Sequence, residues 1–396
     1  MIRGKWQALE VRVAELEQEI LQLPGPRPVL RGSAIPGNGW VEYDVVFQAE
    51  ADRSDVAEII AVFPRGRPLD SARLDALLAK HAPAIDHLRK GTRYERVQAP
   101  VTMQSDLGTF VYYPDTTLAL LILESRRLRG RQASREASDL LLDLAQCSND
   151  LGRHRDRYAQ RLAMEMVNHV FLELLDLLQS GELNAADLKE LGRQLEILDA
   201  NFVRPGSTFL AHSYALGTNI LKGDFSPYDF SDGDPALRDW KHLFSERLML
   251  CDAFEYWDRW NRRLAHVADL SPDETEADCR RADAEAQESR NPVVSALFRN
   301  RGLWCGYGSG TLVRERHAQL RLLRMIAGYR ATGEIPDLDD PFGGKMRHRR
   351  IGKKLRIWSV GSDRKDDGGD GAWEPREIYR DEKSLTVKDI VAETER

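Results

Sequence analysis

Apolar residues recur every three or four positions along most of this chain, the spacing of one face of an amphipathic helix. The first such run comprises Trp6, Leu9, Val13, Leu16, Ile20 and Leu23. It predicts a helix over residues 1–23 that docks within the chain, with self-association in a coiled coil as the alternative. Pro24, Pro26 and Pro28 end this helix, because proline lacks a backbone donor. Residues 24–40 are therefore expected to form a linker.

The periodicity continues over residues 41–310 and predicts an irregular stack of antiparallel helices. These helices are expected at 41–49, 54–63, 69–80, 118–128, 133–147, 158–174, 184–198, 243–266 and 271–290. A short extended piece is expected at 94–97, and the Gly-, Asp-, Ser- and Pro-rich segment 217–240 is expected to be a surface loop. The helix pairs are repeat-like, but no fixed period recurs, so no known repeat family is indicated.

Two helix starts carry strong local signals. Asn184 precedes a helix with Asp187 in its first turn, and Ser271 is followed by Pro272 and, three residues on, Glu274. The helix that follows Ser271 has almost no large apolar residues, so we expect it to lie in water.

Composition limits the class of protein. The 396 residues are 42% hydrophobic and 30% charged, which is typical of a folded protein with two or three domains. The net charge of −6 gives no overall reason to expect a nucleic-acid partner. No stretch reaches the roughly 18 apolar residues of a membrane span, and the start lacks an apolar signal region, so a cytoplasmic location is the default expectation.

Reactive side chains form no recognisable catalytic pattern. The four cysteines lack the paired spacing of zinc sites or disulfide frameworks, and they are expected to be buried free thiols. The nine histidines show no zinc-ligand spacing, and neither a nucleophile elbow nor a phosphate-binding loop with its lysine is present.

The last part of the chain, 311–396, has a different character. A long helix is followed by a Pro-Phe-Gly-Gly turn, a short strand pattern at 355–360 and an acidic glycine run at 363–371. This order predicts a small α+β tail behind a mostly α stack.

Four segments of this tail carry a resemblance to known proteins: Leu320–Arg330, Gly333–Pro336, Asp340–Lys345 and Trp358–Asp363. They resemble the helix-to-sheet half of type II secretion pseudopilins. They also resemble the tails of uncharacterised, mostly helical bacterial proteins of planctomycetes and myxobacteria. Members of that group usually carry a membrane anchor upstream, which leaves open a missing anchor before Met1 and a place at the cell envelope.

The pseudopilin resemblance implies a Ca²⁺ site in the acidic glycine run. Its ligands would be Asp363, Asp366, Asp367 and Asp389, because calcium takes six to eight hard oxygen ligands and glycine lets backbone carbonyls turn toward the ion. Arg364 and Lys365 depart from that pattern by placing positive charge inside the loop. The alternative is a solvated turn without an ion.

Three functions follow as hypotheses. The first is a non-catalytic binding or scaffold protein for an unknown protein partner, since helical stacks offer broad surfaces to partners. The second is an envelope-associated component with a calcium-stabilised, pseudopilin-like tail. The third is an enzyme whose site is assembled from distant residues around 212–240.

Overall fold

The computed structural model describes most of the chain. The described residues are 2–22, 26–48, 70–98, 113–153, 157–223, 246–291, 293–294, 307–371, 373 and 388–395. Within them the protein is mostly helical with a small α+β tail, as predicted; it has eleven helices, and a three-stranded sheet lies near the C-terminus. The helix expected at 54–63 lies outside these ranges. None of the described helices is both long enough and apolar enough to cross a membrane.

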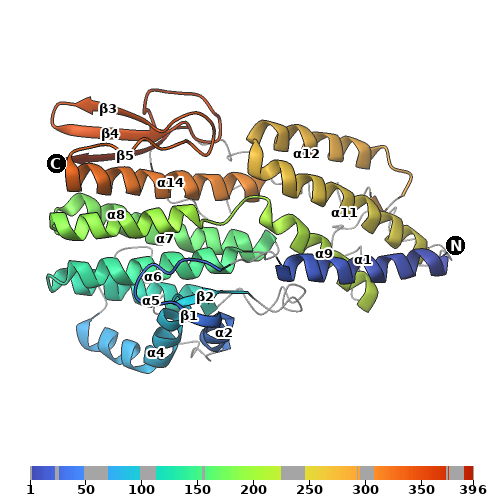
Figure 1. The fold of residues 1–396 in the computed structure, drawn as a ribbon, viewed down its shortest axis with the longest axis horizontal. Coiled ribbons are helices and arrows are strands. Elements are labelled where there is room, and N and C mark those ends of the chain that lie inside the picture. Colours follow the sequence, from blue (N-terminus) through green and yellow to red (C-terminus); the bar gives the residue numbers. More distant parts are fainter. Residues whose placement is uncertain are drawn as a thin grey trace.

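Five helices lie side by side and form the centre of the molecule (Figure 1). They are α5 (Tyr113–Gly130), α6 (Ser134–Gly152), α7 (Arg157–Ser180), α8 (Ala185–Ala200) and α14 (Tyr307–Thr332). Helix α6 packs against α5 and α7, whereas α8 packs mainly against α14. The predicted helix start at Asn184 is confirmed, because its side chain accepts hydrogen bonds from the backbone of Ala186 and Asp187.

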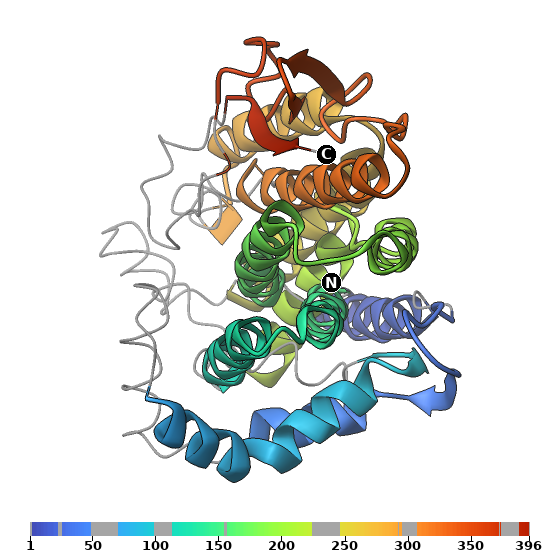
Figure 2. The same ribbon diagram turned by 90° about the vertical axis from the view of Figure 1, so that its left-hand side faces the viewer.

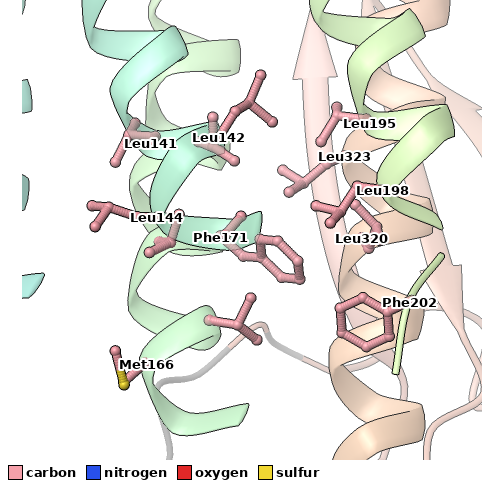
Figure 3. Close-up of a cluster of buried hydrophobic side chains, with 14 of the residues drawn as sticks. Leu141, Leu142, Leu144, Met166, Phe171, Leu195, Leu198, Phe202, Leu320 and Leu323 are labelled. Carbon is pink, nitrogen blue, oxygen red and sulfur yellow. The ribbon is translucent and has the colours of Figure 1, made fainter. Parts of the chain in front are cut away.

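The main hydrophobic core lies between these helices. Figure 3 shows leucines of α6, α8 and α14 meeting Phe171 of α7 and Phe202, which follows α8. Phe171, Leu141 and Leu320 are fully buried. Burying one such side chain stabilises the fold by about 1.5–3 kcal/mol, so the periodic leucines of the sequence account for this packing.

The C-terminal sheet covers the outer side of α14 (Figure 1). It consists of β3 (Arg347–Ile351), β4 (Lys354–Ser359) and β5 (Ile390–Glu395), all antiparallel, with β4 in the middle. Leu355, Ile357 and Ile390 are buried in the main core. The opposite face of the sheet is rich in arginine, as expected for an antiparallel sheet with one apolar face.

A second core joins α1 (Ile2–Gln22), α9 (Ser207–Lys222), α11 (Glu246–Leu270) and α12 (Pro272–Gln287). Helix α1 packs against α9 and α11, so its apolar seam is covered within the chain. Helix α9 was not predicted, and the expected loop start at Gly217 is wrong. A Cβ at Gly217 would lie 2.8 Å from Phe254, so this glycine allows α9 to approach its neighbours closely.

The expectation that the helix after Ser271 lies in water is also wrong. Ser271 does cap α12, since its side chain accepts a hydrogen bond from the backbone of Glu274. However, one face of α12 packs against α11 through small residues, including Cys279, Ala282 and Ala286. Small side chains gave this face no apolar signal in the sequence, yet they permit close packing.

An N-terminal unit lies on the side of the helical stack opposite the sheet (Figure 2). It contains β1 (Ile35–Asn38), α2 (Trp40–Gln48), α4 (Ser71–Gly91) and β2 (Tyr94–Arg96), and β1 pairs with β2 in parallel. The predicted linker therefore contains a strand. Helix α4 also runs eleven residues beyond its predicted end, through the exposed Pro83, because Ala84 and Leu88 continue its buried face.

Replacing Gly91 by alanine tests the packing of this unit. A Cβ at Gly91 would overlap the ring of Tyr43, lying 2.7 Å from its Cδ1, and Tyr43 is fully buried. We expect Gly91→Ala to lower the free energy of unfolding by about 1–3 kcal/mol in chemical denaturation. Gly130→Ala is the matched control, since nothing lies within 4 Å of its Cβ position. Equal stabilities of the two variants would contradict this packing.

Candidate functional site

The acidic glycine run lies on the outer face of the sheet. Asp366 accepts hydrogen bonds from Trp358 Nε1 at 3.0 Å, from the backbone of Gly368 at 3.0 Å and from Arg347 Nε at 2.9 Å. The bond from Trp358, together with the other two, holds the pKa of Asp366 below its usual range. Arg349 and Arg356 donate to the carbonyls of Gly368 and Gly369. The arginines of the sheet thus hold the acidic run in place.

The structure places Asp389 close enough to Asp366 and Asp367 of the acidic run for their charges to act on it. Asp389 is fully buried, and its Oδ2 accepts a hydrogen bond of 2.7 Å from the backbone of Gly369. Burial raises the pKa of Asp389, and the nearby charges of Asp366 and Asp367 raise it further. Asp363 instead accepts a bond from the backbone of Lys365 in a local turn.

No group of three His, Cys, Asp or Glu side chains that could hold a metal ion occurs in the described part of the chain. A calcium ion at the acidic run would therefore need backbone carbonyls beside Asp367 and Asp389. The calcium site stays a prediction.

A basic pocket of about 440 Å³ lies where the N-terminal unit meets α6. Its lining consists of Leu30, Arg31, Asp86, Arg89, Lys90, Thr92, Arg93 and Asp143. Four of these side chains are cationic and two are acidic, so the lining has an excess of positive charge. None of these residues was predicted as a site residue.

Asp143 orients the arginines of this basic pocket. Its buried carboxylate pairs with Arg31 and, at 3.2 Å, with Arg89 Nε. Burial raises the pKa of Asp143, while the two guanidinium groups oppose that rise. Arg31 also pairs with Asp139 at 3.1 Å. Asp143 and Asp139 thus hold Arg31, and Asp143 also holds Arg89.

Lys90 and Arg93 are exposed, as Arg89 is. Lys90 pairs with Glu42 at 2.6 Å, and Glu42 also contacts His87 and accepts a hydrogen bond from Tyr94. Burial favours the neutral form of Glu42, but the bonds from Lys90, His87 and Tyr94 outweigh it and lower its pKa to about 2. Arg93 is exposed and has no carboxylate partner among the described residues.

Behind the pocket, Arg27 joins three parts of the chain. It pairs with Asp150 of α6 at 2.8 Å, and the two side chains are 2% and 0% exposed. It also donates to the carbonyls of Thr92 at 3.0 Å and Gly91 at 3.3 Å. These carbonyls belong to the C-terminal end of α4, whose partial negative charge would repel an anion. Arg27 neutralises that end from behind the pocket.

Tyr43 and Gln146 complete the surroundings of Asp150. Tyr43 donates to Asp150 Oδ2 at 2.9 Å, and Gln146 donates to Oδ1 at 2.7 Å. Burial raises the pKa of Asp150, an effect that Arg27 opposes. Both carboxylate oxygens are thus hydrogen-bonded, which a buried charge requires.

The arrangement suits the binding of an anion. Guanidinium groups match the planar geometry of carboxylates and phosphates and donate paired hydrogen bonds to them. Within the lining, the Thr92 hydroxyl donates to the carbonyl of Arg89 at 2.8 Å and lies 3.4 Å from Asp143, whose carboxylate is already paired with Arg31 and Arg89. The sequence signal for this basic pocket is the run Arg89-Lys90 with Arg93, but such residues are also common at helix C-termini, and the contributions of Arg31 and Asp143 depend on the fold.

Two other regions of the chain contain polar side chains. Residues 224–240, part of the region expected to hold an enzyme site, lie outside the described ranges. Ser213 is fully buried and accepts a hydrogen bond from Asn261, and His212 contacts the edge of Trp257. Between α7 and α14, the buried Arg316 donates to the carbonyl of Met164 and to Gln319. These contacts serve packing.

Comparisons of this chain with protein families, with curated proteins and with solved structures found no match.

Proposed function

We propose that the protein is a non-catalytic binding protein that holds an anionic group of a partner in the basic pocket. The observation that carries this proposal is the pocket lining, where four cationic side chains face a cavity of about 440 Å³. A cavity of this size accommodates a phosphate or a carboxylate-bearing side chain.

Preorganisation supports the proposal. Arg31 and Arg89 are held by Asp143 before any ligand arrives, so fewer side-chain rotations are lost on binding. Arg93, which has no carboxylate partner in the described part of the chain, is available for a direct contact. The helical stack provides the rigid support that such a site needs.

Charge reversal at Arg93 tests this function. We expect the native protein to bind inorganic phosphate and succinate saturably in calorimetric titrations at low salt. A hydrogen bond to a charged group contributes about 1.5–3 kcal/mol, so Arg93→Glu should weaken binding by about 10- to 100-fold. Phosphate and succinate separate the two ligand chemistries, because the stronger binder identifies the group that the basic pocket prefers.

Arg96→Glu is the matched control, since Arg96 is also exposed, lies three residues away and does not line the pocket. It should lose clearly less affinity than Arg93→Glu, since Arg96 does not line the pocket and acts on a bound anion only through the general electrostatic field. The proposal fails if the native protein binds neither probe, or if both variants lose affinity equally.

The second candidate is an envelope-associated component with a calcium-stabilised, pseudopilin-like tail. It is favoured by Asp389, whose buried Oδ1 has no hydrogen-bond partner among the described residues. A buried carboxylate oxygen beside two further aspartates is unfavourable without a cation. Calcium bound by Asp389, Asp367 and backbone carbonyls would relieve that cost.

Thermal unfolding in EDTA and then in millimolar calcium tests the second candidate. Calcium at a hundred times its dissociation constant should stabilise the native protein by about 2.7 kcal/mol. Asp389→Asn and the Asp366→Ala, Asp367→Ala double variant should not respond. Magnesium at the same concentration controls for ionic strength. An unchanged unfolding transition of the native protein in calcium would rule out the ion.

A further inference from the structure

The hairpin of β3 and β4 carries a dense positive charge. Seven of the twelve residues from 345 to 356 are Lys or Arg and none is acidic, whereas the whole chain has a net charge of −6. Most of these side chains are exposed. The charge of the hairpin is therefore positive, whereas the net charge of the whole chain is negative.

Part of this charge is neutralised within the protein. Lys345 pairs with Asp337 and Asp339, Arg347 pairs with Asp366, and Arg356 pairs with Glu393. These pairs lie toward the base and the middle of the hairpin. Lys354, at its end, is 3.7 Å from Glu393.

Three cations near the turn have no carboxylate partner within the described ranges. Arg349 donates to the carbonyl of Gly368, Arg350 lies over the ring of Tyr329, and Lys353 is exposed at the turn. Successive strand residues point to opposite faces, so Arg349 and Arg350 flank the ribbon on its two sides. The free charge is thus concentrated at the end of the hairpin.

An exposed apolar residue lies among these charges. Ile351 is 42% exposed and pairs with Lys354 across the two-residue turn formed by Gly352 and Lys353. Gly352 has a φ of 61°, which this tight turn requires. The turn lies at the same end of the molecule as the C-terminus and far from the N-terminus (Figure 1). Neither the helical core nor the basic pocket uses it.

We propose that the tip of the β3–β4 hairpin docks end-on to an anionic lipid bilayer. An apolar residue ringed by cations matches the boundary between acyl chains and anionic headgroups, where each Lys or Arg adds to the attraction. The net negative charge of the whole chain favours an orientation in which only this tip faces the membrane. The proposal is independent of the basic pocket, which lies on the opposite side of the helical stack.

A nucleic acid fits the hairpin less well. Binding of single strands uses exposed aromatic rings for stacking, but Trp358 is only 6% exposed and is bonded to Asp366. The exposed isoleucine also makes no favourable contact with phosphate groups. Duplex DNA serves as the alternative ligand in the test.

Vesicle co-sedimentation of the full chain tests the proposal. The probes are phosphatidylcholine vesicles with and without 30% phosphatidylglycerol. We expect binding to the anionic vesicles only, weakening as salt rises. The Arg349→Glu, Arg350→Glu, Lys353→Glu triple variant should bind at least about 100-fold more weakly, since each cation contributes about 1 kcal/mol. Ile351→Ser should bind about 10-fold more weakly, because it loses the apolar insertion.

A second triple variant has the same change in charge at exposed positions elsewhere: Arg3→Glu, Lys189→Glu and Lys222→Glu. It should bind anionic vesicles within about threefold of the native protein. Retained folding of every variant is checked by its helical circular dichroism. The proposal is overturned if the native protein ignores anionic vesicles, if both triple variants lose binding equally, or if duplex DNA binds more tightly and without dependence on Ile351.

Discussion

The buried ion pair between Arg27 and Asp150 is the interaction on which the basic pocket depends. The two residues lie 123 positions apart in the sequence and are almost completely inaccessible to solvent. Since an unpaired charge at either position would be costly, the segment that follows the first helix is fixed on α6. The same guanidinium group binds the two carbonyls at the end of α4, so α4, the N-terminal segment and α6 meet at one point. The four pocket cations are placed around that junction.

The ion pairs on the two sides of the helical stack have different arrangements. In the basic pocket, the buried Asp143 holds Arg31 and Arg89 in position, and Arg93 has no carboxylate partner within the described ranges. On the sheet, Asp366 pairs with Arg347, whereas three cations near the hairpin turn, Arg349, Arg350 and Lys353, have no carboxylate partner in the described part of the chain. The rigid core of α6, α7, α8 and α14 separates the two surfaces, so a partner in the pocket and a membrane at the tip could be engaged at the same time. The proposed binding role thus becomes that of a protein that connects two partners.

The sequence predicted what depends on local chemistry. Helical periodicity located the central helices, and Asn184 and Ser271 cap the helices they were expected to start. The errors arise where tertiary contacts override local preference: α4 continues through Pro83, and α9 continues through Gly217, whose missing side chain lets Phe254 pack closely. The acidic run was visible in the sequence, but its pairing with strand arginines was not. The basic pocket could not be predicted, because Arg31, Arg93 and Asp143 meet only after folding.

A double-mutant cycle on the Arg27–Asp150 pair tests the central claim most directly. The free energies of unfolding of Arg27→Met, Asp150→Asn and the double variant are compared with that of the native chain. Breaking a buried pair from one side costs about 3–5 kcal/mol, so we predict that Arg27→Met is strongly destabilising. The double variant should lose less free energy of unfolding than the two single variants lose together. The difference, the coupling energy, should be about 2 kcal/mol or more. Additive losses, with a coupling energy below about 0.5 kcal/mol, would contradict the account.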